Sequence, residues 1–157
     1  MHVRSSSRRV APALAPALAL TVALALTGCS GDSAARGQLS QSAGSAASAT
    51  RSAALVLGLQ EGDRLIPGVE DTGLSSAAQT LATEAGSVAI MSAIGGIGEQ
   101  RDQILSDVRD AQDTLARAQR VATEGQDDHA GLDELRTRLD RLAEQLDAAA
   151  KKLESAG

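Results

Sequence analysis

The chain contains no phenylalanine, tyrosine or tryptophan among its 157 residues. A core without aromatic side chains must be filled by the aliphatic residues, methionine and alanine, and alanine buries little area per residue. Interfaces lined by alanine suit helices that approach closely, and alanine is the strongest helix former. No stretch shows the sustained period-two alternation that is typical of a half-buried strand. The sequence therefore predicts an all-α fold.

The same composition narrows the functional classes. Proteins that bind single-stranded nucleic acid stack bases on aromatic rings, which this chain lacks. A single cysteine excludes a disulfide framework. His2 and His129 are the two histidines of the chain, whereas most active sites use histidine, cysteine or an aromatic-lined pocket. We therefore expect a protein that is not an enzyme, that needs no cofactor and that binds no nucleic acid.

Residues 1–28 have the layout of a secretory signal peptide. Three arginines and no acid precede an apolar run over residues 10–26. The run is at the short limit for a membrane-spanning helix, and Pro12 and Pro16 disfavour a helix further. The arginine pair Arg8-Arg9 leaves both the general and the twin-arginine export routes open. We expect this segment to be removed after export.

The sequence Leu26-Thr27-Gly28-Cys29 comes directly after the apolar run. It resembles the lipobox of bacterial lipoproteins, in which a branched apolar residue and two small residues precede a cysteine. The resemblance implies cleavage between Gly28 and Cys29, acylation of the Cys29 sulfur and an extracytoplasmic location on a bacterial membrane. Two or three acyl chains anchor a protein stably, since each buried CH2 contributes about 0.8 kcal/mol. The rest of the chain resembles no family that we recognise.

From Cys29 onwards the chain has 12 basic and 20 acidic residues, a formal charge of −8. Nucleic acid and anionic head groups would repel such a chain, so acyl chains on Cys29, not a basic patch, would hold it to the membrane. Residues 30–50 are rich in serine, alanine and glycine, and Leu39 is their one large apolar residue. This composition predicts a tether over residues 29–50, which links the lipidated cysteine to a folded domain. Alanine also favours helix, so the part from Ala34 onward could instead extend the next helical segment.

The helical domain is expected over residues 51–157, as a small bundle of three to four segments. The predicted segments are 51–61, 74–94, 99–124 and 128–155. Each glycine inside a helix costs about 1 kcal/mol relative to alanine, so Gly95–Gly98 predicts either a break or a kink. Residues 99–157 hold 14 acids and nine bases, and we expect the last two segments to form a charged antiparallel hairpin like a coiled coil.

The clearest periodicity of the chain is a stripe of leucines in its last segment. With Ala149 between the last two leucines, the residues recur in steps of three and four, as the a and d positions of heptads do. This stripe must be buried, either within the same chain, or against a second copy or another envelope protein. The leucine stripe consists of Leu132, Leu135, Leu139, Leu142, Leu146 and Leu153.

Three further features have competing interpretations. His129 beside Asp127 and Asp128 is a helix start rather than a metal site, because no third or fourth ligand is indicated. The acids Asp107, Asp110 and Asp113 are expected on a solvated helix face, so the sequence predicts no metal site. The uncharged stretch Ala85–Gly98 is too short to span a bilayer. It predicts either a segment that contacts a membrane or a partner, or the most buried helix end, and we favour the buried end.

These observations predict a lipid-anchored envelope protein that acts as a non-catalytic structural or partner-binding helical module. Self-association through the leucine stripe is the sharpest version of this hypothesis. The alternative is a carrier or sensor, which would hold a small apolar ligand between Leu55–Leu59 and Val88–Ile97.

Overall fold

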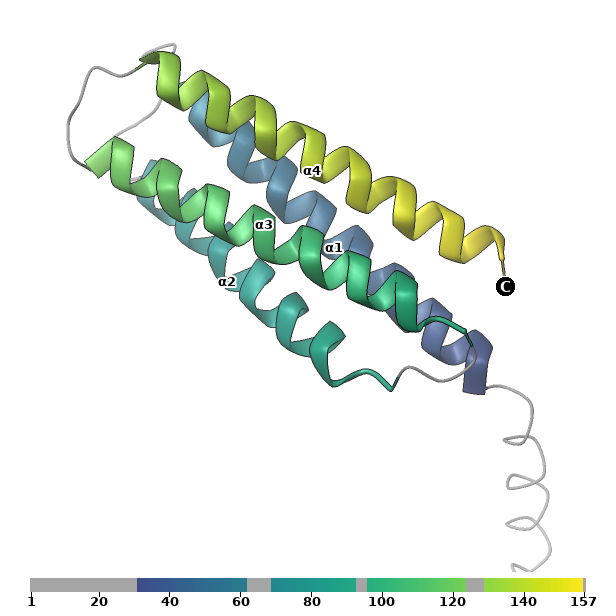
Figure 1. Cartoon of the computed structure of the whole chain (residues 1–157). Helices are drawn as coiled ribbons and strands as arrows, with labels where there is room; N and C mark the ends of the chain where they lie inside the picture. Colours follow the sequence, from purple (N-terminus) through teal and green to yellow (C-terminus); the bar gives the residue numbers. More distant parts are fainter. Residues whose placement is uncertain (1–30, 62–68, 93–95, 124–128, 157) are drawn as a thin grey trace, which may run out of the picture. The chain divides into compact units, whose positions relative to one another are not determined.

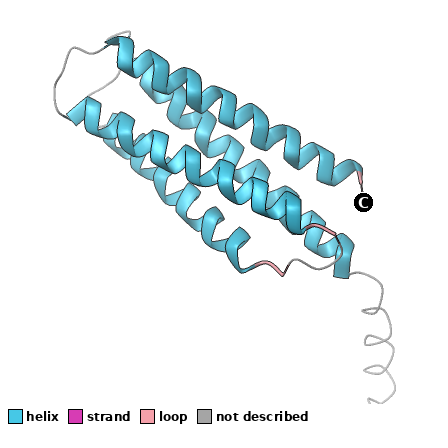
Figure 2. Ribbon diagram, viewed as in Figure 1, coloured by secondary structure: helices cyan, strands magenta, loops and turns pink. Residues whose placement is uncertain are grey.

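The computed structural model describes residues 31–61, 69–92, 96–123 and 129–156, and these residues form four helices and no strand (Figures 1 and 2). The helices are α1 (Gly31–Glu61), α2 (Val69–Ile90), α3 (Gly98–Thr123) and α4 (His129–Ser155). The predicted all-α bundle is therefore confirmed. All of α2, α3 and α4, and α1 from Asp32, belong to one compact unit.

Each helix packs antiparallel to the next, and α4 returns to pack against α1 (Figure 1). The side chain of Val56 in α1 lies against Gly73 in α2. On the other side of α1, the hydroxyl of Ser40 donates to the backbone oxygen of Ala150 in α4 at 3.1 Å. This arrangement gives every helix two neighbours and one inward face.

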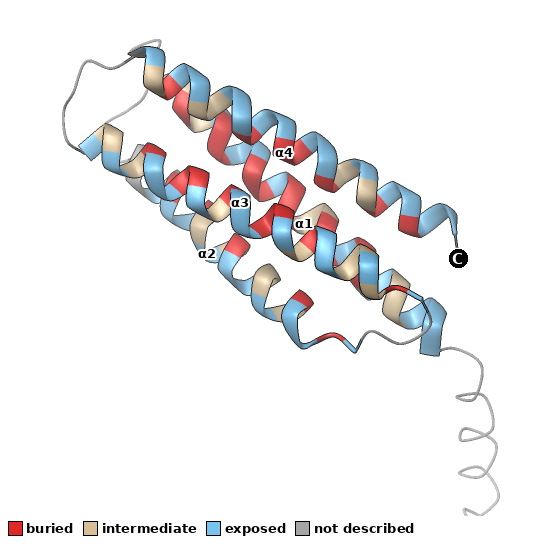
Figure 3. Cartoon of the chain, viewed as in Figure 1, coloured by how far each residue is buried: buried red, intermediate tan, exposed pale blue. Residues whose placement is uncertain are grey.

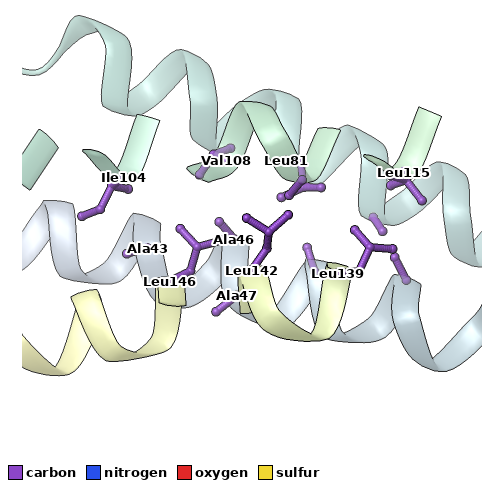
Figure 4. Close-up of a cluster of buried hydrophobic side chains, with 14 of the residues drawn as sticks. Ala43, Ala46, Ala47, Leu81, Ile104, Val108, Leu115, Leu139, Leu142 and Leu146 are labelled. Atoms are coloured by element: carbon purple, nitrogen blue, oxygen red, sulfur yellow. The ribbon is translucent and has the colours of Figure 1, made fainter. Parts of the chain in front are cut away.

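The inward face of each helix carries one buried stripe, in which residues recur in steps of three and four (Figure 3). This spacing keeps the side chains on one side of a helix that packs against others at a small angle. In Figure 4, the leucines of α4 meet alanines of α1 and aliphatic residues of α2 and α3. The buried stripe of α3 consists of Ile104, Val108, Ala111, Leu115 and Ala118. The buried stripe of α2 consists of Leu74, Ala77, Leu81 and Val88, and the buried Met91 follows directly after this helix.

The predicted tether is wrong, because α1 begins at Gly31 instead of residue 51. The buried stripe of α1 runs through the supposed tether in steps of four and three, and all of its members are fully buried: Leu39, Ala43, Ala46, Thr50, Ala53 and Leu57. The Thr50 hydroxyl donates to the backbone oxygen of Ala46 at 2.7 Å, so this polar side chain enters the core with its hydrogen bond made. Alanine leaves room for the leucines of α4, which is why a tract with one large apolar residue still packs.

The second predicted segment, 74–94, differs at both ends, because α2 begins at Val69 and ends at Ile90. Residues 91, 92, 96 and 97 are not helical, and Gly96 has a φ of 79° that favours glycine. The glycine-rich region is therefore a break between two helices and not a kink. The third and fourth predicted segments, 99–124 and 128–155, agree with α3 and α4 to within one residue.

Candidate functional site

The predicted modification site, Gly28 and Cys29, lies outside the described residues, as does the predicted signal peptide. The first described helix is close to it in the chain, because α1 begins at Gly31, two residues after Cys29. An extended chain spans at most about 3.6 Å per residue, so two residues span about 7 Å. At most about 7 Å of chain therefore separates Cys29 from the start of α1.

The leucine stripe of α4 packs inside its own chain. Leu139 and Leu146 are fully buried, while Leu132, Leu142 and Leu153 are exposed by 7% or less. Leu135 is half-buried at the edge of the core. Figure 4 shows Leu139, Leu142 and Leu146 pointing toward the other helices of the same bundle. Of the two arrangements that the sequence left open, the structure contains the intramolecular one.

The two segments proposed to enclose a ligand lie at opposite ends of the bundle. Val56, within Leu55–Leu59, is level with Gly73 at the start of α2. Val88 lies 15 residues further along α2, which is about 22 Å at 1.5 Å per residue. A carrier site between these two segments is therefore contradicted by the antiparallel packing of α1 and α2.

Some polar side chains connect α1 with the end of α4, and others form hydrogen bonds within one helix. The Ser40 hydroxyl, which contacts Ala150, also lies 3.2 Å from Oε1 of Glu154 and so ties α1 to the end of α4. Lys151 Nζ donates to Asp147 Oδ2 at 2.7 Å, and this hydrogen bond lowers the pKa of the Asp147 carboxyl. Arg36 Nη1 donates to the backbone oxygen of Ala156 at 2.8 Å.

The acidic residues of α3 do not gather into a site. Asp107 is buried at the edge of the core, whereas Asp110 and Asp113 are exposed, so the predicted solvated face is wrong for one of the three. Burial raises the pKa of the Asp107 carboxyl, although Gln103 Nε2 donates a hydrogen bond to it at 2.8 Å. His129 is the first residue of α4, and Asp127 and Asp128 lie outside the described residues. Within the described part of the chain, no three His, Cys, Asp or Glu residues come close enough to hold a metal ion.

Two open grooves flank α1. The groove between α1 and α2 has a volume of about 500 Å³ and is lined by small or uncharged residues, namely Ser45, Ser48, Ala49, Ser52, Val56, Gly73, Ser76, Ala77 and Thr80. The groove between α1 and α4 has a volume of about 450 Å³ and is lined by Arg51, Ala54, Leu55, Gly58, Leu59, Arg136 and Asp140. No charged residue lines the first groove, whereas Arg51, Arg136 and Asp140 line the second.

The uncharged stretch Ala85–Gly98 is not the most buried helix end that we favoured. Val88, Met91 and Ile97 are buried, but Ile90 is 86% exposed. Arg101 fixes the connection from the α3 side, because its Nη1 donates to the backbone oxygen of Met91 at 2.8 Å. None of the described helices has both the length and the hydropathy that crossing a membrane requires.

Sequence reasoning missed the stripe of α1 and the exposure of Ile90. The first could have been found from the regular steps of four and three that connect Leu39 with Leu57, had alanine and threonine been counted as core residues. The exposure of Ile90 has no signal in the sequence, because Ile90 and Met91 are adjacent apolar residues. Only the packing of α2 decides that Met91 is buried and Ile90 is exposed.

Comparison with models of protein families, with curated proteins and with solved structures finds no significant match to this chain.

Proposed function

We propose that this chain is a lipoprotein, anchored by Cys29 to the extracytoplasmic face of a bacterial membrane. Its bundle would act as a non-catalytic structural or partner-binding module. The lipobox Leu26-Thr27-Gly28-Cys29 supports the anchor. The residue inventory supports a non-catalytic role, because acylation would consume the one thiol and leave His129 as the single histidine after cleavage.

The observation that carries this proposal furthest is the start of α1 at Gly31. Because only Ser30 separates Cys29 from Gly31 in the sequence, an acylated cysteine would hold the folded domain close to the membrane. A helix of 31 residues is about 46 Å long, which limits how far the module reaches from the surface. This geometry suits a protein that acts close to the bilayer.

A partner of the module would have to bind an outer surface, because the leucine stripe is covered by the other helices. The groove between α1 and α2 supports the partner-binding version, since no charged residue lines it. Interface centres are depleted of charge in the same way.

The anchor is tested by metabolic labelling with a fatty-acid analogue and by cell fractionation. We expect the wild-type chain and a Ser30→Ala control to carry the label and to sediment with membranes. Cys29→Ala should lose both properties, because no other residue of the chain has a thiol. Absence of label from the wild-type chain would refute the anchor.

The two versions of the module are separated by photo-crosslinking in intact cells. A crosslinking amino acid at Ser48 would sit in the uncharged groove, and one at the exposed Gln145 on α4 serves as the matched control. A single defined protein captured from position 48 but not from position 145 supports partner binding. No product from either position supports a structural spacer.

A further inference from the structure

One end of α2 exposes a large apolar side chain in an uncharged setting. Among the described residues, Leu55 and Ile90 are the large hydrophobic residues that are exposed, by 65% and 86%. The side of α2 that carries Ile90 also carries Gln79, Thr83 and Gly86, none of which is charged. The nearest acid on this helix, Glu84, is rotated by about 120° away from Ile90.

Ile90 lies at the end of the bundle where the chain enters it. Val56 and Gly73 are level with one another in α1 and α2. Ile90 is 17 residues beyond Gly73 and Leu39 is 17 residues before Val56, so antiparallel packing places Ile90 level with Leu39. Leu39 is eight residues, or about 12 Å, from Gly31. Leu55, by contrast, lies next to the opposite end of α1.

The charged residues at this end lie on the other helices, and they include the exposed Asp32 in the first turn of α1 and the exposed Glu99 in the first turn of α3. Arg101 holds Asp102 through two hydrogen bonds, at 3.0 and 2.7 Å, and also donates to the backbone oxygen of Met91. The charged residues near the end of α4, Lys151, Lys152 and Glu154, belong to a helix that packs against α1 and α3 (Figure 1). The tip of α2 is therefore the uncharged corner of this end of the bundle.

We propose that the tip of α2, with Ile90 at its centre, contacts the lipid bilayer beside the acylated Cys29, as a second and non-covalent attachment. This inference rests on the proposed lipid anchor. Neighbouring helix axes are about 8–10 Å apart and the helix radius with side chains is about 5 Å. Ile90 thus lies about 12 Å along the bundle axis from Gly31 and about 14 Å to the side of the α1 axis. If the bundle axis tilted by roughly 40° from the membrane normal toward α2, Ile90 and Gly31 would lie at the same height above the bilayer.

We expect this surface to contact a bilayer rather than a charged ligand, because Ile90 is apolar and the side of α2 that carries it has no charged residue. The formal charge of −8 from Cys29 onwards opposes anionic lipid, so the contact should form on zwitterionic phosphatidylcholine and should not depend on salt. Such a contact fixes the orientation of the bundle on the membrane, which a single acylated residue leaves free.

The absence of aromatic residues makes this inference directly testable, because one introduced tryptophan is the only fluorophore of its kind in the chain. The full-length gene is expressed with Ile90→Trp or with Leu55→Trp, and the protein is purified from membranes. A mass spectrum of the N-terminal peptide establishes acylation of Cys29. The protein is then reconstituted into phosphatidylcholine vesicles with and without brominated acyl chains, which quench tryptophan on contact.

We expect brominated lipid to quench the Ile90→Trp variant at least about twofold more than the Leu55→Trp variant, with a shift of emission to shorter wavelength for the first alone. Tryptophan itself favours the membrane interface, so Leu55→Trp is the matched control: it adds the same side chain at the other exposed apolar position. Both substitutions are on the surface, and circular dichroism checks that both variants keep the helical content of the wild type.

Acylated protein in which Ile90→Trp is quenched no more than Leu55→Trp would overturn the membrane contact and leave the anchor standing. If the emission of Ile90→Trp shifted with protein concentration and brominated lipid did not quench it, the tip of α2 would contact a second copy of the chain. This result would also overturn the membrane contact. Protein without acyl chains on Cys29 would refute the proposed anchor and, with it, this inference.

Discussion

The ionisation of Asp107 opposes the fold. Burial raises the pKa of its carboxyl, the hydrogen bond from Gln103 lowers it by less, and the charge of Asp110 raises it further. The folded state therefore binds the proton of Asp107 more tightly than the unfolded state does. The contribution of this group to stability is favourable at low pH and is lost as the pH rises from about 3.8 through the raised value.

Asp107→Asn should therefore stabilise the protein at pH 7, because it removes the buried charge and keeps a partner for Gln103. Below about pH 3.8 the advantage should vanish, because the wild-type carboxyl is then neutral as well. Urea unfolding of both proteins at pH 7 and pH 3 measures the difference, and Asp110→Asn is the exposed control. An advantage that is equal at both pH values would contradict the assigned cause.

Two glycines inside helices are expected to respond differently to the same substitution. A methyl group at Gly44 would meet no atom within 4 Å, whereas one at Gly73 would lie 3.0 Å from Cγ2 of Val56. Gly44→Ala should raise the free energy of unfolding by about 0.5–1 kcal/mol, because alanine is the better helix former. Gly73→Ala should lose most of that gain, since Val56 must move. Thermal unfolding monitored by circular dichroism compares the two, and an equal gain would mean that Val56 yields freely.

At the scale of the element, α1 is the helix in which composition and packing disagree. A tract of serine, alanine and glycine predicts a flexible chain, because it offers little apolar area to bury. In α1 the buried residues fall on one face in steps of three and four, and Ala43 and Ala46 lie on the side of α1 that faces larger aliphatic side chains of the other helices (Figure 4). The apolar area that stabilises α1 is thus supplied mostly by its neighbours.

Ala46→Leu tests whether this tract belongs to the core. Ala46 is fully buried, so a larger side chain must displace its neighbours. We expect the free energy of unfolding to fall by about 1–3 kcal/mol. Ala34→Leu, at an exposed position of the same helix, should change it by less than about 0.5 kcal/mol. If chemical denaturation gave the same stability for both variants, residues 31–50 would not pack as described.

In α3 and α4, unlike in α1, composition and packing agree, because the alternation of charged and aliphatic residues in their sequence already shows which side is buried. Charged residues alternate with aliphatic ones, so the buried side can be read from the spacing of Ile104, Val108 and Leu115 or of the leucine stripe. The predicted bounds agree with the observed ones to within one residue. In α2 the bounds were less well predicted. At its C-terminal end, residues without charge give no contrast between an inner and an outer face.

At the scale of the whole molecule, the bundle covers its own leucine stripe, which makes its folding a property of one chain. Leu139→Ala should lower the free energy of unfolding by about 2–5 kcal/mol, because Leu139 is fully buried. Leu135→Ala, at a half-buried position of the same stripe, should cost less. The melting temperature of each protein should not change with its concentration, as it does when the folded state is an oligomer. A melting temperature that rises with concentration would instead show that the stripe joins two chains.

The sequence by itself determined that the described chain is helical, and it located α3, α4 and an interruption at the glycines, because these depend on local propensity and on the contrast of charged and aliphatic residues. Whether that interruption is a break or a kink was left to the structure. It also identified Cys29 as the candidate for acylation, since a lipobox is contiguous. Only the tertiary structure decided that residues 31–50 join the core, that the leucine stripe is satisfied within one chain and that Ile90 remains exposed. The physical reason is that burial belongs to the surfaces of several helices together, so an alanine or an isoleucine has no inside or outside until its neighbours are placed.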